Sequence, residues 1–125
     1  MVGKVRAALD ARLRRDTLIV ARTDAAAVEG FEAALERASA YADAGADVVF
    51  VEAPRSREEM ERIVQTLGDT PAMANMVEGG QTPILSRDAL SEMGFRLVIS
   101  PGARVRALIP TAEAFLAKLK RDGST

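Results

Sequence analysis

Four short apolar runs, separated by segments with helical spacing, limit the fold of this chain more than any other feature. The runs cover residues 18–21, 48–51, 72–74 and 97–99. They read as strands that alternate with helices, and connections of this length favour parallel pairing. Nearly all of their positions are apolar, which predicts a sheet covered on both faces or the inside of a barrel. The pattern therefore predicts an α/β fold with four parallel strands.

Helical segments with their own start and stop signals fill the spaces between these runs. Ser56 and Glu59 form a capping box at the start of one helix, and Ser86 opens another. Gly45 and Gly94 stand where helices commonly end in a left-handed residue. The expected helices cover about residues 5–13, 29–44, 56–68, 86–94 and 105–119, and the expected strands cover about 17–22, 47–52, 71–76 and 96–100.

The first and last helices are predicted from apolar stripes. Val5, Leu9 and Leu13 recur every four residues, as they would on one helical face. The last stripe runs from Val105 to Leu119 and contains a proline, Pro110. Because proline removes an N–H and clashes with the preceding turn, we expect a kink or a fresh helix start there.

Composition excludes several classes of protein. The 125 residues are 48% hydrophobic and 28% charged, an ordinary globular mixture for one domain or less. A net charge of −1 without a basic stripe argues against a nucleic-acid partner. The apolar runs are far shorter than the roughly 20 residues of a membrane span. Together with an amino end that lacks the apolar core of a signal peptide, this predicts a cytoplasmic protein.

The chain contains neither cysteine nor histidine. Disulfides and thiolate chemistry are therefore excluded, and imidazole is missing both as an acid or base and as a metal ligand. Any chemistry must rest on carboxylates, guanidinium groups, amides and hydroxyls.

Each apolar run is followed closely by a polar side chain. These are Arg22, Glu52, Asn75 and Ser100. In parallel α/β folds ligands bind at the carboxyl ends of the strands, so these four positions are the candidate site.

Each candidate also has a purely structural interpretation. Arg22 could pair with Asp24, or its planar fork could bind a carboxylate or phosphonate and stabilise an enolate. Glu52 could pair with Arg22, orient a substrate hydroxyl or carboxylate, or do both. Asn75 could satisfy a turn or hydrogen-bond a carboxylate. We favour the site interpretation for all three, and expect Thr23 and Asp24 to shape the turn.

The motifs at these strand ends resemble one known family, the isocitrate lyase / phosphoenolpyruvate mutase superfamily. Its methylisocitrate lyase, oxaloacetate decarboxylase and carboxyphosphonoenolpyruvate mutase branches are nearest in motif. The resemblance runs in order along nearly the whole chain, in residues 19–25 (Ile-Val-Ala-Arg-Thr-Asp-Ala), 44–47 (Ala-Gly-Ala-Asp), 50–53 (Phe-Val-Glu-Ala), 74–80 (Ala-Asn-Met-Val-Glu-Gly-Gly) and 82–83 (Thr-Pro).

The resemblance implies a TIM-type barrel with a carboxyl-terminal helix swapped between subunits. The chain is similar to the middle and later βα units only, so residues 1–125 are expected to form a single partial barrel domain, half of a TIM-type barrel with four strands. The family binds Mg²⁺ through acidic residues on earlier strands and carries a loop with Cys and His. Because this chain has neither, the resemblance implies Mg²⁺ as cofactor but leaves its ligands outside the chain.

For function, the resemblance implies a lyase or mutase that acts on a small 2-oxo or 2-hydroxy di- or tricarboxylic acid, or a phosphonate, through a stabilised enolate. Arg22 would share the enolate charge, while Glu52 and Asn75 would bind the carboxylates. We expect the chain alone to be inactive, as a fragment, a truncated gene product or one piece of a split enzyme. We also expect a homo-oligomer or a complementing chain.

Two interpretations from other classes remain open. One is a catalytically inactive α/β module that self-associates or complements a partner chain. The other is a compact flavodoxin-like binder, which the absence of a nucleotide motif disfavours. The loop at residues 78–83 fits no phosphate-binding spacing and is expected to be a flexible turn.

Overall fold

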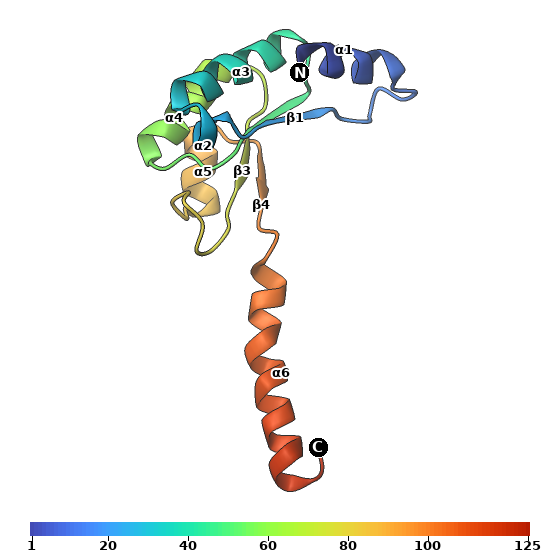
Figure 1. Cartoon of the computed structure of the whole chain (residues 1–125), viewed down its shortest axis with the longest axis vertical. Coiled ribbons are helices and arrows are strands. Elements are labelled where there is room, and N and C mark those ends of the chain that lie inside the picture. The colour runs from blue at the N-terminus through green and yellow to red at the C-terminus, as the bar shows by residue number, and fades with distance from the viewer.

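The computed structural model describes all residues, 1–125, and has six helices and four strands (Figure 1). They follow one another as α1 (Val2–Ala11), β1 (Val20–Thr23), α2 (Ala25–Val28), α3 (Phe31–Asp43), β2 (Val48–Val51), α4 (Arg57–Leu67), β3 (Met73–Asn75), α5 (Arg87–Met93), β4 (Leu97–Ile99) and α6 (Ala103–Asp122). The expected alternation of strands and helices is confirmed.

The strands pair in parallel, as predicted, but they form two small sheets. β1 pairs with β2, and β3 pairs with β4. An isolated parallel bridge between Val49 and Ala72 links the sheets, and the Val49 N–H donates to the Pro71 carbonyl over 2.9 Å. Neighbours in space are therefore neighbours in sequence, in the order β1, β2, β3, β4.

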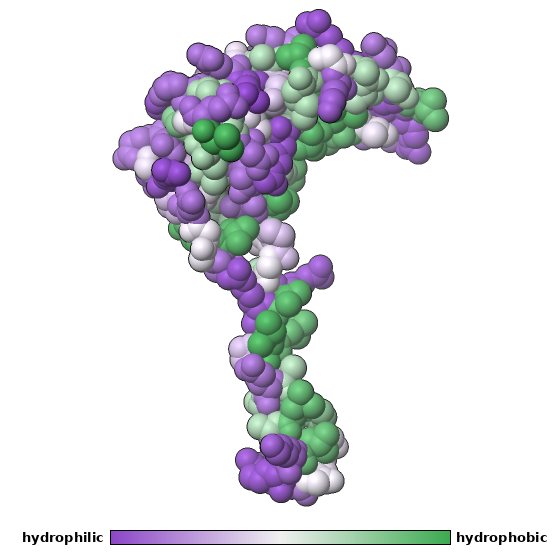
Figure 2. Space-filling view, viewed as in Figure 1, coloured by the Kyte–Doolittle hydropathy of each residue, from purple (hydrophilic) through white to green (hydrophobic).

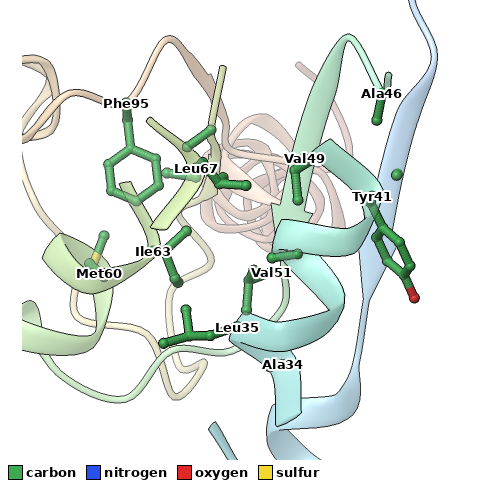
Figure 3. Packing of buried hydrophobic residues seen from close by; sticks show 14 of the residues in the cluster. Ala34, Leu35, Tyr41, Ala46, Val49, Val51, Met60, Ile63, Leu67 and Phe95 are labelled. Atoms are coloured by element: carbon green, nitrogen blue, oxygen red, sulfur yellow. The ribbon is translucent and has the colours of Figure 1, made fainter. Parts of the chain in front are cut away.

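The main core lies between the strands and the helices that cover one face of them. Figure 3 shows Val49 and Val51 of β2 packed with side chains from α3 and α4. The buried helical residues are Ala34, Leu35, Ala38 and Tyr41 of α3 and Met60, Ile63 and Leu67 of α4. Burying a large apolar side chain contributes about 1.5–3 kcal/mol, so these two helices hold the strands in place.

The outer strands depart from the expected burial on both faces. All four residues of β2 are buried, but exposed and buried residues alternate along β1. Val20 of β1 is 46% exposed, and Leu97 and Val98 of β4 are 39% and 40% exposed. An apolar run predicts burial only if something covers the strand, and nothing in this chain covers these positions.

The predicted caps are confirmed. Ser56 Oγ accepts a hydrogen bond from the Glu59 N–H over 3.2 Å, and Glu59 Oε2 accepts one from the Arg55 N–H over 2.6 Å. In a standard capping box Glu59 would accept from the N–H of Ser56; here it accepts from the N–H of the preceding residue, Arg55. Gly45 and Gly94 have φ values of +95° and +108°, in the left-handed region that glycine tolerates best.

Two helix boundaries differ from the prediction. Helix α1 ends at Ala11, and Leu13 is fully exposed, because Arg12 turns the chain into extended backbone. Asp47 Oδ2 fixes this turn by accepting hydrogen bonds from Arg12 Nη1 and the Ile19 N–H, each over 2.8 Å. The helix expected over 29–44 is α3, which begins at Phe31 because its N-cap residue Gly30 has a φ of +99°; the short helix α2 before it was not predicted.

Helix α6 projects away from the rest of the molecule (Figure 1). It continues through Pro110, so no new helix starts there, and none of its residues is buried. Figure 2 shows hydrophobic surface along its length. Val105, Leu108 and Leu116 are 62%, 65% and 59% exposed. None of the helices combines the length and hydropathy needed to cross a bilayer.

Candidate active site

The structure places the predicted site residues at the carboxyl ends of neighbouring strands. Arg22 lies in β1 opposite Phe50 of β2, and the Glu52 N–H donates to the Thr23 carbonyl over 3.0 Å. Counting on from the Val49–Ala72 bridge brings Glu52 level with Asn75 at the end of β3. Arg22, Glu52 and Asn75 therefore occupy one edge of the strand array, as the sequence predicts.

Asp24 binds the Arg22 guanidinium in a two-point ion pair. Arg22 Nε donates to Asp24 Oδ2 over 3.0 Å, and Arg22 Nη2 donates to Asp24 Oδ1 over 2.7 Å. This contact raises the pKa of Arg22 and lowers the pKa of Asp24. Both groups are therefore charged across the physiological pH range.

Two further groups contact the same guanidinium. Glu52 Oε2 lies 2.9 Å from Arg22 Nη2. The centre of the guanidinium stands 5.0 Å from the centroid of the Phe50 ring, within range of a cation–π contact. Arg22 Nη1 has no hydrogen-bond partner, so both of its N–H groups are free to donate to a ligand.

Two buried oxygens at this edge lack a hydrogen-bond donor. They are Glu52 Oε2, which is close to Arg22 but not aligned for a hydrogen bond, and Asn75 Oδ1. A buried acceptor without a donor costs about 1–3 kcal/mol, so such atoms are rare in folded proteins. Each is a place where a ligand hydroxyl or a water molecule would be stabilised, and rotation of the Asn75 amide would present its N–H groups instead.

The backbone after Glu52 is strained. Ala53 has a φ of +57°, the only positive φ outside glycine. Non-glycine residues in such conformations cost roughly 1–3 kcal/mol and cluster at functional sites. Ala53 also lines a small pocket with Asn75 and Thr82. Sequence reasoning missed Ala53, and the one available signal was its place between a strand end and Pro54.

The remaining polar residues of this edge divide as follows. Thr23 is buried and its Oγ1 accepts a hydrogen bond from the Ala25 N–H over 3.3 Å, so its predicted turn role is confirmed. Asp24 precedes α2 but makes no side-chain cap, because its carboxylate binds Arg22. Ser100 is exposed.

The loop at residues 78–83 is tied at two points. Arg106 of α6 donates to the carbonyl oxygen of Glu78. Arg55, in the loop after β2, donates through Nε to Gln81 Oε1 over 3.0 Å. The loop therefore lies against the segments that follow β2 and β4, close to the candidate site.

The residues present do not fit a magnesium site. Mg²⁺ requires several oxygen ligands in octahedral geometry. The two carboxylates of this edge, Asp24 and Glu52, both face the positive charge of Arg22. No group of three or more acidic side chains is close enough to hold a metal ion.

Comparison with known proteins identifies the family. The family model for phosphoenolpyruvate phosphomutase matches residues 1–120. The chain is 44% identical to 2,3-dimethylmalate lyase of Eubacterium barkeri, over 100% of this chain and 43% of that protein. It is 44% identical to a probable 2-methylisocitrate lyase of Corynebacterium glutamicum, over 99% of this chain and 41% of that protein.

Solved structures agree with the sequence comparison. A crystal structure of 2,3-dimethylmalate lyase, a member of the PEP mutase/isocitrate lyase superfamily, matches with a TM-score of 0.89 and 41% identity. The match covers 98% of this chain and 44% of that chain. The chain thus spans about two fifths of the length of the relatives it matches. On this similarity in sequence and structure, the chain belongs to the phosphoenolpyruvate phosphomutase family, within the isocitrate lyase / PEP mutase superfamily.

Proposed function

We propose that this chain is part of a lyase or mutase that acts on a small 2-oxo or 2-hydroxy acid through a stabilised enolate. The two relatives named above are lyases of 2,3-dimethylmalate and 2-methylisocitrate, both substituted hydroxy acids with several carboxylates. The observation that carries the proposal is the set of buried oxygens without donors, Glu52 Oε2 and Asn75 Oδ1, at the same strand edge as the free Nη1 of Arg22. Acceptors and donors there match a molecule that has both hydroxyl and carboxylate groups.

In this proposal Arg22 stabilises negative charge on the substrate. When the bond between the hydroxyl-bearing carbon and the carbon next to a carboxylate breaks, the hydroxyl passes its proton to the carboxylate it contacts, Glu52, and becomes a carbonyl. The electron pair of the broken bond moves onto an oxygen of the substrate carboxylate, which forms an enolate. A fixed cation at that oxygen lowers the barrier because it needs no reorganisation during the reaction. Arg22 stays protonated throughout, because its contact with Asp24 raises an already high pKa.

Glu52 and Asn75 would position the substrate. A 2-hydroxyl group can donate to the buried Oε2 of Glu52, which lacks a donor. The Asn75 amide, rotated to present its N–H groups, can donate to a carboxylate. These contacts would align the bond that breaks with the enolate site, and orientation of this kind contributes strongly to catalysis.

We propose that residues 1–125 form one partial barrel domain, half of a TIM-type barrel. The order of the parallel strands along the chain, the exposed apolar residues of β1 and β4, and the greater length of the relatives support this. Mg²⁺, which the family resemblance implies, would supply Lewis-acid stabilisation of the enolate from ligands outside this chain.

The test is a chimeric enzyme. The matched region of the E. barkeri 2,3-dimethylmalate lyase is replaced by this chain, and cleavage of 2,3-dimethylmalate is measured with Mg²⁺. We expect turnover by the chimera and none by residues 1–125 alone, with 2-methylisocitrate and oxaloacetate as further substrates. A folded chimera without turnover would contradict the proposal, as would turnover by the isolated chain.

Association is a second candidate role, favoured by the exposed apolar surface of α6. We propose that the chain forms a homo-oligomer or complements another chain, because open strand edges and an uncovered helical face both favour pairing. Light scattering of the isolated chain at micromolar concentration is the test. A monomer that melts cooperatively would argue against it.

A further inference from the structure

The Arg22 guanidinium has an unequal set of contacts around its edge. Asp24 takes the Nε and Nη2 donors through two hydrogen bonds, over 3.0 and 2.7 Å. Glu52 Oε2 stands 2.9 Å from Nη2 but is not aligned to accept a hydrogen bond from it. Two of the five N–H donors are thus bonded to Asp24, the second N–H of Nη2 has only the unaligned Glu52 carboxylate near its nitrogen, and Nη1 carries the remaining two.

This arrangement restricts how Arg22 can bind a ligand. A carboxylate that binds an arginine side-on uses two nitrogens at once, Nε with Nη2 or Nη1 with Nη2. Asp24 occupies the first edge, and Glu52 places a negative charge beside the second. A bidentate ligand carboxylate would have to displace one of them or stand against its charge.

We infer that Asp24 is a positioning residue that holds Arg22 so that Nη1 alone is presented to the ligand. Arg22 then donates to one oxygen, as an enolate requires, and not to a carboxylate fork. The Phe50 ring supports the plane of the guanidinium from one face. The inference deepens the proposed function, on which its catalytic meaning rests, but the geometry can be tested without turnover.

The Asp24 side chain does not cap helix α2, which leaves it available to position Arg22. It stands at the N-cap position of α2, where an aspartate side chain commonly accepts a backbone hydrogen bond. It makes no such bond. The side chain therefore contributes to the position of Arg22 and not to the start of the helix, so replacing it should change Arg22 without unfolding the chain.

A matched pair elsewhere in the chain provides the control. Arg14 and Asp16 have the same spacing, and Arg14 also donates through Nε and Nη2 to the two carboxylate oxygens of Asp16. No aromatic ring or second carboxylate is found against Arg14. The pair is also more exposed, at 77% and 64% against 50% and 58% for Arg22 and Asp24.

The experiment is NMR of the full chain with ¹⁵N-labelled arginine, with Arg22 signals assigned by their loss in Arg22→Lys. We expect separate Nη1 and Nη2 signals for Arg22, because two-point binding slows rotation about the Nε–Cζ bond. Asp24→Ala should merge them, and Asp16→Ala should leave them unchanged. The free energy of unfolding of Asp24→Ala, measured in urea, should match that of the parent chain. The merged Arg22 signals would then reflect a mobile Arg22 side chain in a folded protein.

Oxalate, a small dicarboxylate, serves as the ligand probe. On addition of millimolar oxalate we expect the Nη1 signals of Arg22 to shift while the Nε–H signal stays, and both to shift in Asp24→Ala. An Nε–H shift in the parent chain would overturn the inference, as would Arg22 signals that Asp24→Ala does not change. A third outcome is separate Nη1 and Nη2 signals that oxalate does not shift. It would support the positioning role of Asp24 and count against the proposed function, so failure of the inference and failure of the proposed function can be told apart.

Discussion

Two arginine–aspartate pairs in this chain have the same spacing and the same two-point contact, yet only one lies at a candidate site. Arg14 and Asp16 sit in the segment between α1 and β1, with Leu13 fully exposed beside them. Arg22 and Asp24 sit at the end of β1, with Phe50 and Glu52 against the guanidinium. Under the proposed function, an arginine–aspartate pair of this kind has no role by itself, and the neighbours on the adjacent strand, Phe50 and Glu52, distinguish the pair at the site.

The largest expected difference between the pairs is catalytic. In the chimeric lyase, Arg22→Ala should lower kcat/KM by roughly 10²–10³-fold, as loss of a donor to a developing oxyanion does. Arg14→Ala should leave kcat/KM unchanged. Steady-state kinetics with 2,3-dimethylmalate checks both, and equal losses in the two variants would show that the neighbours of Arg22 do not matter.

The second carboxylate is the feature that Arg14 lacks. Glu52→Gln removes the charge of the Glu52 carboxylate at nearly constant shape. The side-chain oxygen can then accept a hydrogen bond from the substrate only as a neutral amide. We expect kcat/KM of the chimera to fall between about tenfold and a hundredfold, since hydrogen bonds to charged groups contribute about 1.5–3 kcal/mol. The control is Glu92→Gln on the exposed surface of α5. A Glu52→Gln enzyme with full activity would limit Glu52 to an ion-pair role.

The backbone beside each pair should also differ in stability. Thr23 is 3% exposed and accepts a hydrogen bond from the Ala25 N–H, whereas Thr17 is exposed. Thr23→Ala should lower the free energy of unfolding by about 1–2 kcal/mol, and Thr17→Ala by less than about 0.5 kcal/mol. Urea unfolding measures both. Similar values would mean that the end of β1 is no better fixed than the surface segment.

The smallest expected difference lies in acid titration. Arginine contacts lower the pKa of Asp24 and of Asp16 below their ordinary values. Because each folded-state pKa is depressed, the stabilisation is present above the unfolded-state pKa of about 3.9 and is lost as the pH falls through the folded-state pKa. A ¹³C NMR titration of the carboxyl groups should show both carboxyls below their ordinary range, and Arg22→Ala should restore only Asp24. A normal pKa for Asp24 would contradict the two-point contact.

The elements and the site edge were predictable because their signals are local. Ser56 caps the start of α4 and Gly94 ends α5 in a left-handed conformation, and both effects involve only residues nearby in the sequence. Arg22, Glu52 and Asn75 were predictable because parallel strands bring their carboxyl ends to one edge. The motifs around them were enough to indicate the family that the comparisons confirm.

The rest depended on contacts that spacing does not encode. Leu13 continues the stripe of α1, yet Asp47 ends that helix from a distant segment by binding Arg12. Asp24 fits both a turn and an ion pair with Arg22, and only three-dimensional geometry separates these. The apolar stripe of α6 predicts a helix correctly but says nothing about where its covering surface lies.

The most direct test of this account is a crystal structure of the chimeric lyase with oxalate bound. Arg22 Nη1 should lie about 2.7–3.2 Å from a ligand oxygen, within ordinary hydrogen-bond distance, with Asp24 still on Nε and Nη2. The Asn75 amide should contact the same ligand, and Glu52 should line the site. Oxalate bound away from this strand edge, with Arg22 contacting only Asp24 and Glu52, would contradict the account.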